Sequence, residues 1–206
     1  MAGHEHDWVD GFLFIGNQLA LDLLNTRPLM DGQLVELLPD FGAVLRWLRA
    51  AGLLDGAQVG RLERRWGKSA EARRTVEEIR EFRERLRAEL LRWEDGGALS
   101  HAMVRELNRL QAEYPMRRRL AAKSGAPAME SYFEVQKPED LFAPLADAAA
   151  RLFTEADRAR LRKCRNCILH FLDTSKKGTR QWCSMQLCGN RFKVAAYAAR
   201  KRSERD

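Results

Sequence analysis

The sequence predicts a mainly α-helical protein with a small β component: a helical N-terminal domain followed by a C-terminal treble-clef-like or ribbon-like zinc module that ends in a basic helix. Three observations lead to this expectation. Apolar residues recur at spacings of three and four through most of the chain. All four cysteines lie in the last quarter, and the positive charge is concentrated there too. We expect the boundary near residue 157, between a domain of residues 1–157 and one of residues 158–206.

The two predicted domains differ in charge. Residues 158–206 hold fourteen Lys or Arg against three Asp or Glu, a net charge of +11, whereas residues 1–157 carry −4. A segment this basic is typical of one that binds a polyanion, the alternative being a solvated basic tail. No apolar run is long enough to span a bilayer, and the N-terminus does not resemble a signal peptide. We therefore expect a cytoplasmic protein that does not contact a membrane.

The first predicted element lies in "FLFIGNQLALDLLNT". The apolar run 12–15 is expected to form a strand or an extended arm, and Gly16 breaks it. Asn17 is then expected to cap a helix that closes near Arg27-Pro28. The polar side chains of this stretch form a candidate small-molecule site, the alternative being a packed helix with polar outer residues. The candidate ligand-binding residues are Asp22, Asn25 and Arg27.

Four further helices are predicted between residues 40 and 114. The first begins after Pro39-Asp40 and ends at Gly52, and the second covers residues 56–66. The third and longest runs from about Ser69 to Trp93 with an apolar stripe of period 3.6, and Ser100 caps the fourth.

The helical spacing of apolar residues is interrupted after residue 115. Residues 117–136 predict a β-hairpin about a Ser-Gly turn, because the second run is rich in strand-forming residues. Residues 137–164 predict another helix, whose Pro144 falls early enough to be tolerated.

The cysteines have the pattern C-x2-C-x15-C-x4-C. Two close pairs about fifteen residues apart are typical of a structural zinc site, in which four thiolates surround one ion. We expect the first thiolate of the second pair to end a strand and the second to lie in or near the first turn of a helix, whose dipole stabilises negative charge. The predicted ligands of one structural Zn²⁺ are Cys164, Cys167, Cys183 and Cys188.

Other interpretations of the cysteines are less favoured. Disulfides are rare in the reducing cytoplasm, and the βαβ context of a thiol-redox pair at Cys164 and Cys167 is missing. Catalytic zinc is disfavoured because four thiolates would saturate the ion. His170 follows Cys167 closely enough to replace a ligand, but with four thiols available we expect a surface or packing residue.

The segment after the last cysteine predicts a helix with an apolar strip and a cationic face. The loop "TSKKGTR" adds further cations close to the metal. For Arg191 two roles stay open, a bond to carbonyl groups of the zinc site or a contact with phosphate. The candidate nucleic-acid-binding residues are Lys176, Lys177, Arg180, Arg191, Lys193, Arg200, Lys201 and Arg202.

Two stretches resemble known families. "CRNCILHFLDTSKKGTRQWCSMQLCGNR" resembles the CGNR zinc finger, named for the tetrapeptide present here at residues 188–191. Upstream, "FLFIGNQLALDLLNT" resembles the opening of the ABATE domain, which usually accompanies this finger. The resemblance implies a bacterial, stress-responsive transcription regulator in which a DNA-binding finger follows a sensory or interaction domain.

We therefore expect a transcription regulator that binds DNA through a module stabilised by zinc. The alternative is a protein-interaction module that docks on an acidic partner, such as a subunit of the transcription machinery, while the N-terminal domain binds a small-molecule effector. We do not expect an enzyme, because the sequence offers no nucleophile–base pair and no phosphate-binding loop.

Overall fold

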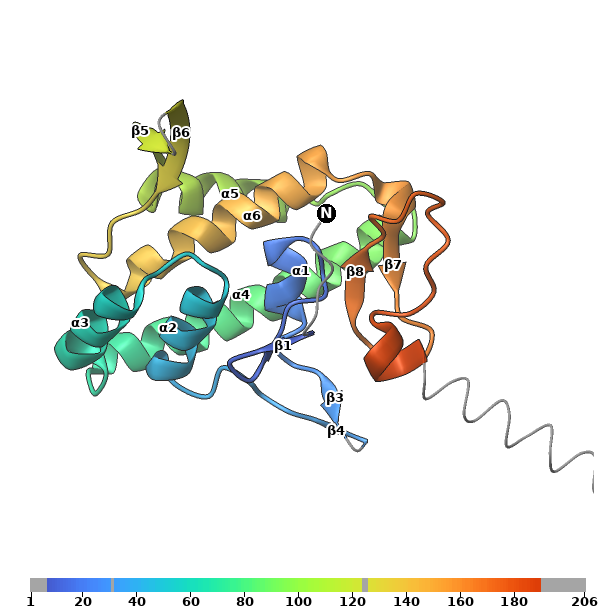
Figure 1. The fold of residues 1–206 in the computed structure, drawn as a ribbon, viewed down its shortest axis with the longest axis horizontal. Helices are drawn as coiled ribbons and strands as arrows, with labels where there is room; N and C mark the ends of the chain where they lie inside the picture. Colours follow the sequence, from blue (N-terminus) through green and yellow to red (C-terminus); the bar gives the residue numbers. More distant parts are fainter. Residues whose placement is uncertain (1–6, 31, 124–125, 190–206) are drawn as a thin grey trace, which may run out of the picture. The chain divides into compact units, whose positions relative to one another are not determined.

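The computed structural model describes residues 7–30, 32–123 and 126–189. Within them the fold is mainly helical, with four two-stranded antiparallel sheets (Figure 1). The contacts divide the chain into two compact units: residues 37–155, which we call the helical unit, and residues 1–36 with 156–206, which we call the cysteine unit. No helix in the described ranges is both long enough and apolar enough to span a membrane.

The helical unit contains the predicted helices, and the first four have nearly the predicted bounds. The helix predicted over residues 137–164 is shorter than expected: it ends at Glu155, and Leu161–Lys163 form a strand instead. Each of the first four begins just after a side chain that accepts a hydrogen bond from a backbone N–H group of the first turn. These caps are Asp40, Asp55, Ser69 and Ser100. The helices are α2 (Phe41–Ala50), α3 (Gly56–Trp66), α4 (Ala70–Glu94) and α5 (His101–Glu113), followed later by the 3-10 turn η1 (Pro138–Leu141) and α6 (Phe142–Glu155).

Large apolar side chains fill the core of the helical unit. Helix α5 packs along α6, and α2 contacts both α3 and α4 (Figure 1). The ring of Phe142 lies edge-on to Phe82 and stacks on Tyr114, with centroids 5.9 Å apart in both pairs. Trp47 is fully buried. The continuous chain of this unit therefore has an apolar core of its own.

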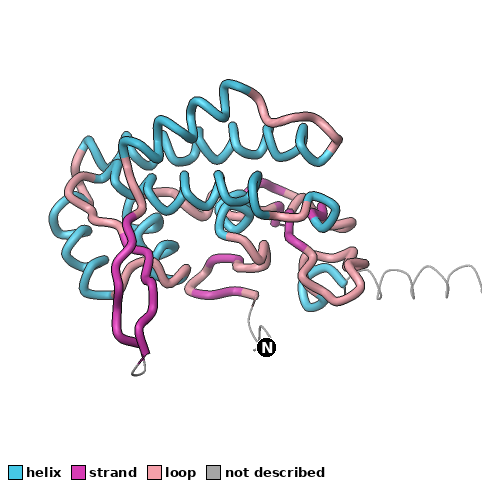
Figure 2. Tube along the Cα trace, turned by 90° about the horizontal axis from the view of Figure 1, so that it is seen from above, coloured by secondary structure: helices cyan, strands magenta, loops and turns pink. Residues whose placement is uncertain are grey.

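The predicted hairpin consists of β5 (Arg117–Lys123) and β6 (Ala126–Tyr132). The strands pair in register from Arg117 opposite Tyr132 to Lys123 opposite Ala126. Figure 2 shows this hairpin as the long magenta ribbon that extends away from the helices of its unit. The strand-forming run of the sequence predicts a second strand over Ser131–Val135, but β6 begins at Ala126, because Ala126 and Pro127 already pair with the first strand.

The cysteine unit combines both ends of the chain. In its N-terminal part, β1 (Trp8–Val9) pairs with β2 (Phe12–Leu13), helix α1 (Leu19–Leu24) follows, and β3 (Leu29–Met30) pairs with β4 (Gln33–Leu34). In its C-terminal part, the turn η2 (Arg158–Arg160) leads into β7 (Leu161–Lys163), which pairs with β8 (His170–Leu172), and a helical turn η3 (Met185–Gly189) ends the described chain.

Two local expectations differ from the structure. The charge pattern placed residues 1–36 with the helical domain, but their described part packs with the cysteine-containing segment, because apolar side chains of β2 cover the thiols. The expectation that Asn17 caps α1 is wrong. Asn17 has a φ of +57°, and the cap is Gln18, whose side-chain oxygen accepts from the N–H groups of Ala20 and Leu21.

Candidate metal centre

Two backbone turns bring the four cysteines together. In the first, Cys164 follows β7, and its N–H group donates to the carbonyl of Leu169 at 2.9 Å, which closes the loop that carries Cys167. In the second, Ser184 caps the turn η3 by accepting from the N–H group of Gln186 at 3.0 Å. Cys188 lies inside this helical turn, and the helix expected to follow it lies outside the described residues. The expectation that Cys183 ends a strand is wrong, because the residues before it form irregular backbone.

The distances between the sulfur atoms fit one tetrahedral ion. All four Sγ atoms lie within 4.8 Å of one another, and those of Cys167 and Cys183 are 3.7 Å apart. Four sulfurs at about 2.3 Å from one zinc ion lie about 3.8 Å from one another. A disulfide would need a separation of about 2.05 Å, and all four thiols are free. The donor set is therefore that of one structural zinc ion, and four thiolates leave no open position for a substrate.

The electrostatics of the thiols also call for a cation. Hydrogen bonds from Cys167 and Cys183 hold the pKa of the Cys164 thiol far below its usual range. The hydrogen bond of Cys167 to Cys164 raises the pKa of Cys167 to about 12, and the pKa of Cys183 is raised as well, again mainly through Cys164. Negative charge is thus favoured on Cys164 and disfavoured on Cys167 and Cys183, because charged sulfur atoms this close together repel one another. A divalent ion offsets that repulsion, which couples metal binding to folding.

An apolar layer surrounds the thiols, and part of it comes from the N-terminal segment of the chain. Phe171 and Leu169 pack against the cysteines from the C-terminal segment, and Leu13 and Ile15 pack from the N-terminal one. Trp182 is partly buried against the same cluster. The contribution of β2 had no signal in the sequence beyond a short apolar run. The metal site is therefore built from residues that are about 150 positions apart.

Helix α1 holds the free edge of strand β8. The side chain of Asn25 makes two hydrogen bonds to the backbone of His170: its Nδ2 donates to the carbonyl at 2.9 Å, and its Oδ1 accepts from the N–H group at 3.1 Å. Asn17 Nδ2 donates to the carbonyl of Leu172 at 2.8 Å, and the N–H group of Leu172 donates to the carbonyl of Gly16, also at 2.8 Å. These bonds satisfy backbone groups that an edge strand would otherwise leave open.

Two of the candidate ligand residues of the N-terminal stretch, Asp22 and Asn25, serve this same packing. Asn25 is fully buried, and both ends of its amide are bonded to β8. Asp22 is buried and accepts from the N–H group of Gly16 at 2.7 Å, and burial raises the pKa of this carboxyl to about 7. A Cβ on residue 16 would lie 2.7 Å from that of Leu21, so only glycine fits there. Arg27 is half-buried. Asp22 and Asn25 thus face inward, not outward.

The loop after β8 is bonded firmly to the metal unit. The buried carboxylate of Asp173 accepts from the N–H groups of Ser175 at 2.9 Å and Arg180 at 2.8 Å. Arg160 donates to the carbonyls of Asp173 and Ser175, and Arg162 donates to the carbonyl of Gly178. These bonds fix the backbone of residues 173–180.

The predicted nucleic-acid-binding residues fall into three groups. Lys176 and Lys177 are exposed at the tip of this loop. Arg180 instead donates to the carbonyls of Trp182 and Cys183, and its guanidinium lies 4.5 Å from the centre of the Phe171 ring, so it braces the metal site. The remaining candidates, and the basic helix to which they were assigned, lie outside the described residues: Arg191, Lys193, Arg200, Lys201 and Arg202.

One contact and two exposed cations of the cysteine unit were not predicted from the sequence. Ser184, beside Cys183, donates a short hydrogen bond to Asp7, which ties the second turn to the N-terminus. Lys163 and Arg165, on either side of Cys164, are exposed cations that the sequence analysis did not single out. His170 is buried as a packing residue, and among the described residues the candidate metal cluster consists of cysteines alone.

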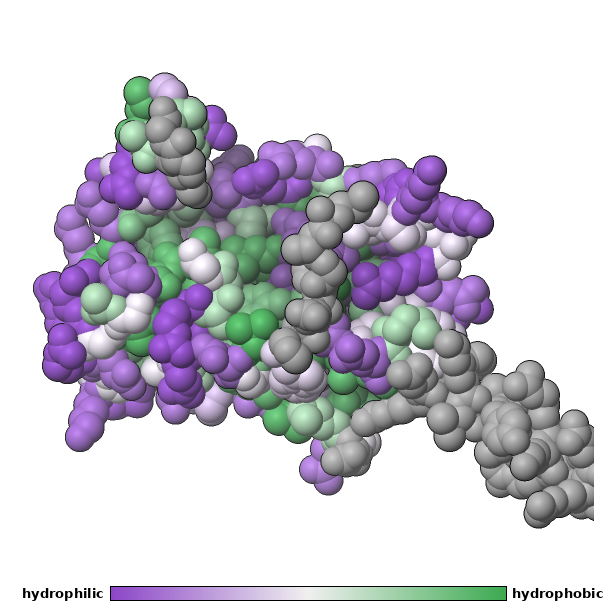
Figure 3. All heavy atoms as spheres, viewed as in Figure 1, coloured by the Kyte–Doolittle hydropathy of each residue, from purple (hydrophilic) through white to green (hydrophobic). Residues whose placement is uncertain are grey.

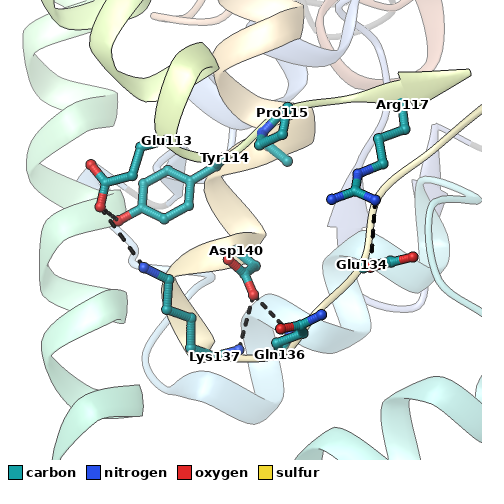
Figure 4. Close-up of a pocket in the computed structure, with 9 residues that line it drawn as sticks. Glu113, Tyr114, Pro115, Arg117, Glu134, Gln136, Lys137 and Asp140 are labelled. Carbon is teal, nitrogen blue, oxygen red and sulfur yellow. Dashed lines mark hydrogen bonds and ion pairs between the residues drawn. The ribbon is translucent and has the colours of Figure 1, made fainter.

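The helical unit has a separate groove of about 410 Å³ between the end of α5 and η1. Its charged groups pair with one another, as Figure 4 shows. Tyr114 donates to Glu113 at 2.7 Å, Asp140 accepts from the N–H groups of Gln136 and Lys137, and Arg117 lies 3.9 Å from Glu134. A ligand in this groove would have to displace these pairs.

Comparisons with known families agree with both parts of the chain. A family model described as "Putative stress-induced transcription regulator", ABATE, matches residues 17–156, and the CGNR zinc finger matches residues 160–201. A search of curated proteins found no match. The finger match covers the four cysteines whose sulfur atoms the structure brings together. The chain therefore belongs to the ABATE family and carries a C-terminal CGNR zinc finger.

Proposed function

We propose that this chain is a transcription regulator without catalytic activity, whose zinc module binds duplex DNA. The observation that carries the proposal is the loop of residues 173–180, which presents Lys176 and Lys177 to solvent from a backbone anchored to the metal site. A loop held in one conformation loses little entropy on binding, so its charges are pre-organised for phosphate.

The charge distribution supports the same partner. The segment from residue 158 has a net charge of +11, and four thiolates with one Zn²⁺ would lower it to about +9. Arg160, Arg162 and Arg180 use their guanidinium groups on backbone carbonyls. The exposed lysines of the loop, together with Lys163 and Arg165, are therefore the described cations best suited to contact phosphate groups.

The helical unit would then carry the sensory or interaction role. Its size and separate core suit a part that responds to an effector or a partner protein, and the groove of Figure 4 is a concave surface available for such contacts. In the cell we place the chain in the cytoplasm of a bacterium, with a regulatory role in the stress response that the family description names.

The proposal is tested by titrating fluorescent duplex DNA of random sequence with the full chain between 50 and 300 mM salt. We expect binding that weakens with salt at a log–log slope of about −3 to −5. Changing both Lys176 and Lys177 to Ala should weaken binding about tenfold and make the slope shallower by about 2. The matched control changes Lys68 and Arg105, two exposed cations of the helical unit, to Ala.

Two outcomes would contradict this function. One is the absence of duplex binding at 50 mM salt by protein that carries one zinc ion per chain. The other is an equal loss of affinity in the control variant, which would mean that net charge alone drives the association. If the protein does not bind duplex DNA but binds an acidic polypeptide such as poly-glutamate through Lys176 and Lys177, the zinc module docks on an acidic protein partner instead.

A further inference from the structure

The hairpin of β5 and β6 is a free-standing ribbon. Its strands pair with each other over seven positions and form a sheet of two strands, with no third strand beside them in the described parts of the chain. Seven residues of strand extend about 23 Å. Figures 1 and 2 both show the ribbon projecting from the helices of its unit. A hairpin of this length, with no third strand beside it in the described residues, is a candidate binding element.

One face of the ribbon is apolar and uncovered. The register places Leu120 opposite Met129 and Ala122 opposite Pro127, all on one face. Leu120 is 73% exposed and Met129 63%, which makes them the two most exposed large apolar residues of the described chain. Hydrophobic atoms gather toward the outer end of the hairpin in Figure 3. Such exposure costs free energy in water and is typical of a contact surface.

The ribbon is also cationic. Residues 117–132 contain four cations and one acid, Glu130, within an N-terminal region whose net charge is −4. Arg118 lies on the same face as Leu120, two residues away along β5. On the opposite face Arg117 lies 3.9 Å from Glu134 and Arg119 lies 2.8 Å from Glu130, with both arginines more than half exposed. Exposed pairs of this kind are weak, so a polyanion can take over both guanidinium groups.

The shape of the ribbon favours a nucleic-acid groove over a protein surface. Its outer half carries mostly small side chains: apart from Lys123, the paired residues there are Ala121, Ala122, Ala126, Pro127 and Ala128. Two strands about 4.8 Å apart fit the major groove, about 12 Å wide, and can enter the minor groove, about 6 Å wide, once it opens. Protein interfaces instead rely on large aromatic anchors, which this half lacks.

Pairing with a second copy of the chain is the less suitable use. Pro127 has no N–H group to donate, which interrupts an added strand along β6. A symmetric face-to-face contact would also bring the two Arg118 side chains of a dimer close together. Two short ribbons bury far less than the roughly 1,200 Å² of a stable interface.

We propose that hairpin β5–β6 is a second DNA-binding element, separate from the zinc module. It enters a groove of the duplex as a β-ribbon, with Leu120 and Met129 as an apolar wedge against the bases and Arg118 directed to the backbone. Ribbons and wedges of this composition unstack base steps and bend DNA. The ribbon would therefore add bending to the phosphate contacts of the zinc module.

The test uses the full chain and a 30-base-pair duplex labelled at both ends, so that affinity and end-to-end distance are measured together. Leu120→Gln with Met129→Gln should weaken binding about tenfold and abolish the shortening of the end-to-end distance. The matched control is Leu91→Gln with Val104→Gln, which removes two exposed apolar side chains from helices α4 and α5 of the same unit. Arg118→Ala, compared with Arg105→Ala, should make the salt slope shallower by about 1.

Unchanged affinity and an unchanged end-to-end distance in the hairpin variant would overturn the proposal. So would a dimer of the wild type, measured by sedimentation, that dissociates in the hairpin variant alone. The zinc module gives a different result: changing Lys176 and Lys177 should weaken binding but leave the bend of the saturated complex in place. Loss of binding in the lysine variant only would support the zinc module and refute the ribbon.

Discussion

The two compact units are stabilised in different ways. The helical unit is one continuous stretch, residues 37–155, and its core contains fully buried rings such as Trp47 and Phe82. The described cysteine unit draws on two stretches separated by that unit, and its apolar cluster centres on four thiols. The comparison shows how a basic segment with few apolar residues can fold. It binds a metal ion, and apolar residues of the N-terminal segment, Leu13 and Ile15, pack against its cysteines.

The same difference appears in their polar groups. In the helical unit the hydrogen bonds that begin helices are local, because a cap and its helix are neighbours in sequence. In the cysteine unit the decisive bonds are remote, as between Asn25 and His170 or between Asp7 and Ser184. We therefore expect perturbations of one unit to leave the other folded.

The largest effect should follow from loss of the metal. Cys183→Ser, or a strong chelator, should unfold residues 7–36 and 156–189, because structural zinc supplies about 10–16 kcal/mol in comparable modules. Hydrogen exchange should then rise in β8 and stay low in α4. Metal analysis of the purified wild type should give one zinc per chain. A chain with little zinc whose exchange ignores the chelator would contradict the assignment.

The converse perturbation is a cavity in the helical core. Phe82 is fully buried against Phe142, so Phe82→Ala should destabilise the helical unit by about 3–5 kcal/mol. Urea unfolding followed by far-ultraviolet circular dichroism measures this loss, and zinc content should be unchanged. Release of zinc at the urea midpoint of the helices would show that the two units unfold together.

A smaller effect is expected where α1 holds β8. Asn25→Ala leaves a buried N–H group and a buried carbonyl of His170 without their partner, which should cost about 2–4 kcal/mol. Zinc release to a colorimetric chelator on heating should begin at a lower temperature, while the helical unit melts as before. Asn108→Ala, at an exposed position of α5, is the control and should change neither transition.

The smallest effect concerns the charge of Asp22. Its folded pKa of about 7 lies above the unfolded value near 3.8, so the folded state binds more protons and stability falls as pH rises between these values. From pH 5 to pH 8 the wild type should lose about 2 kcal/mol relative to Asp22→Asn, which keeps an oxygen to accept from Gly16. Denaturant unfolding of both proteins across this range measures the difference. Asp95→Asn, at an exposed residue, should follow the wild type.

Much of the helical unit could be predicted because its signals are local. A stripe such as Val76, Ile79, Phe82 and Leu86 repeats with the period of a helix, and Ser69 stands where a cap must stand. The metal ligands were equally predictable, since the spacing of the cysteines reflects the tight turns that carry them. The zinc-binding interpretation and the helical fold are confirmed, whereas the proposed contacts with DNA stay predictions.

The errors lie where a residue acts on a distant partner. Asn17 is a good cap by type, yet it adopts positive φ and bonds to Leu172 instead. Arg180 has the charge expected of a phosphate contact, yet its guanidinium is used on the backbone beside Cys183. Residue type does not distinguish these uses, because the alternative partner comes into reach only in the folded chain.

By itself, the sequence determined the helices of the helical unit, caps such as Ser69 and Ser100, the set of four thiols and the concentration of positive charge. Tertiary structure alone decided that residues 7–36 complete the zinc module, that Asn25 bonds to His170, and that Leu120 and Met129 share one uncovered face. The physical reason is the distance along the sequence over which each interaction acts. Periodicity and capping act within a few residues, whereas a hydrogen bond across 145 residues leaves no periodic trace and depends on how the chain closes.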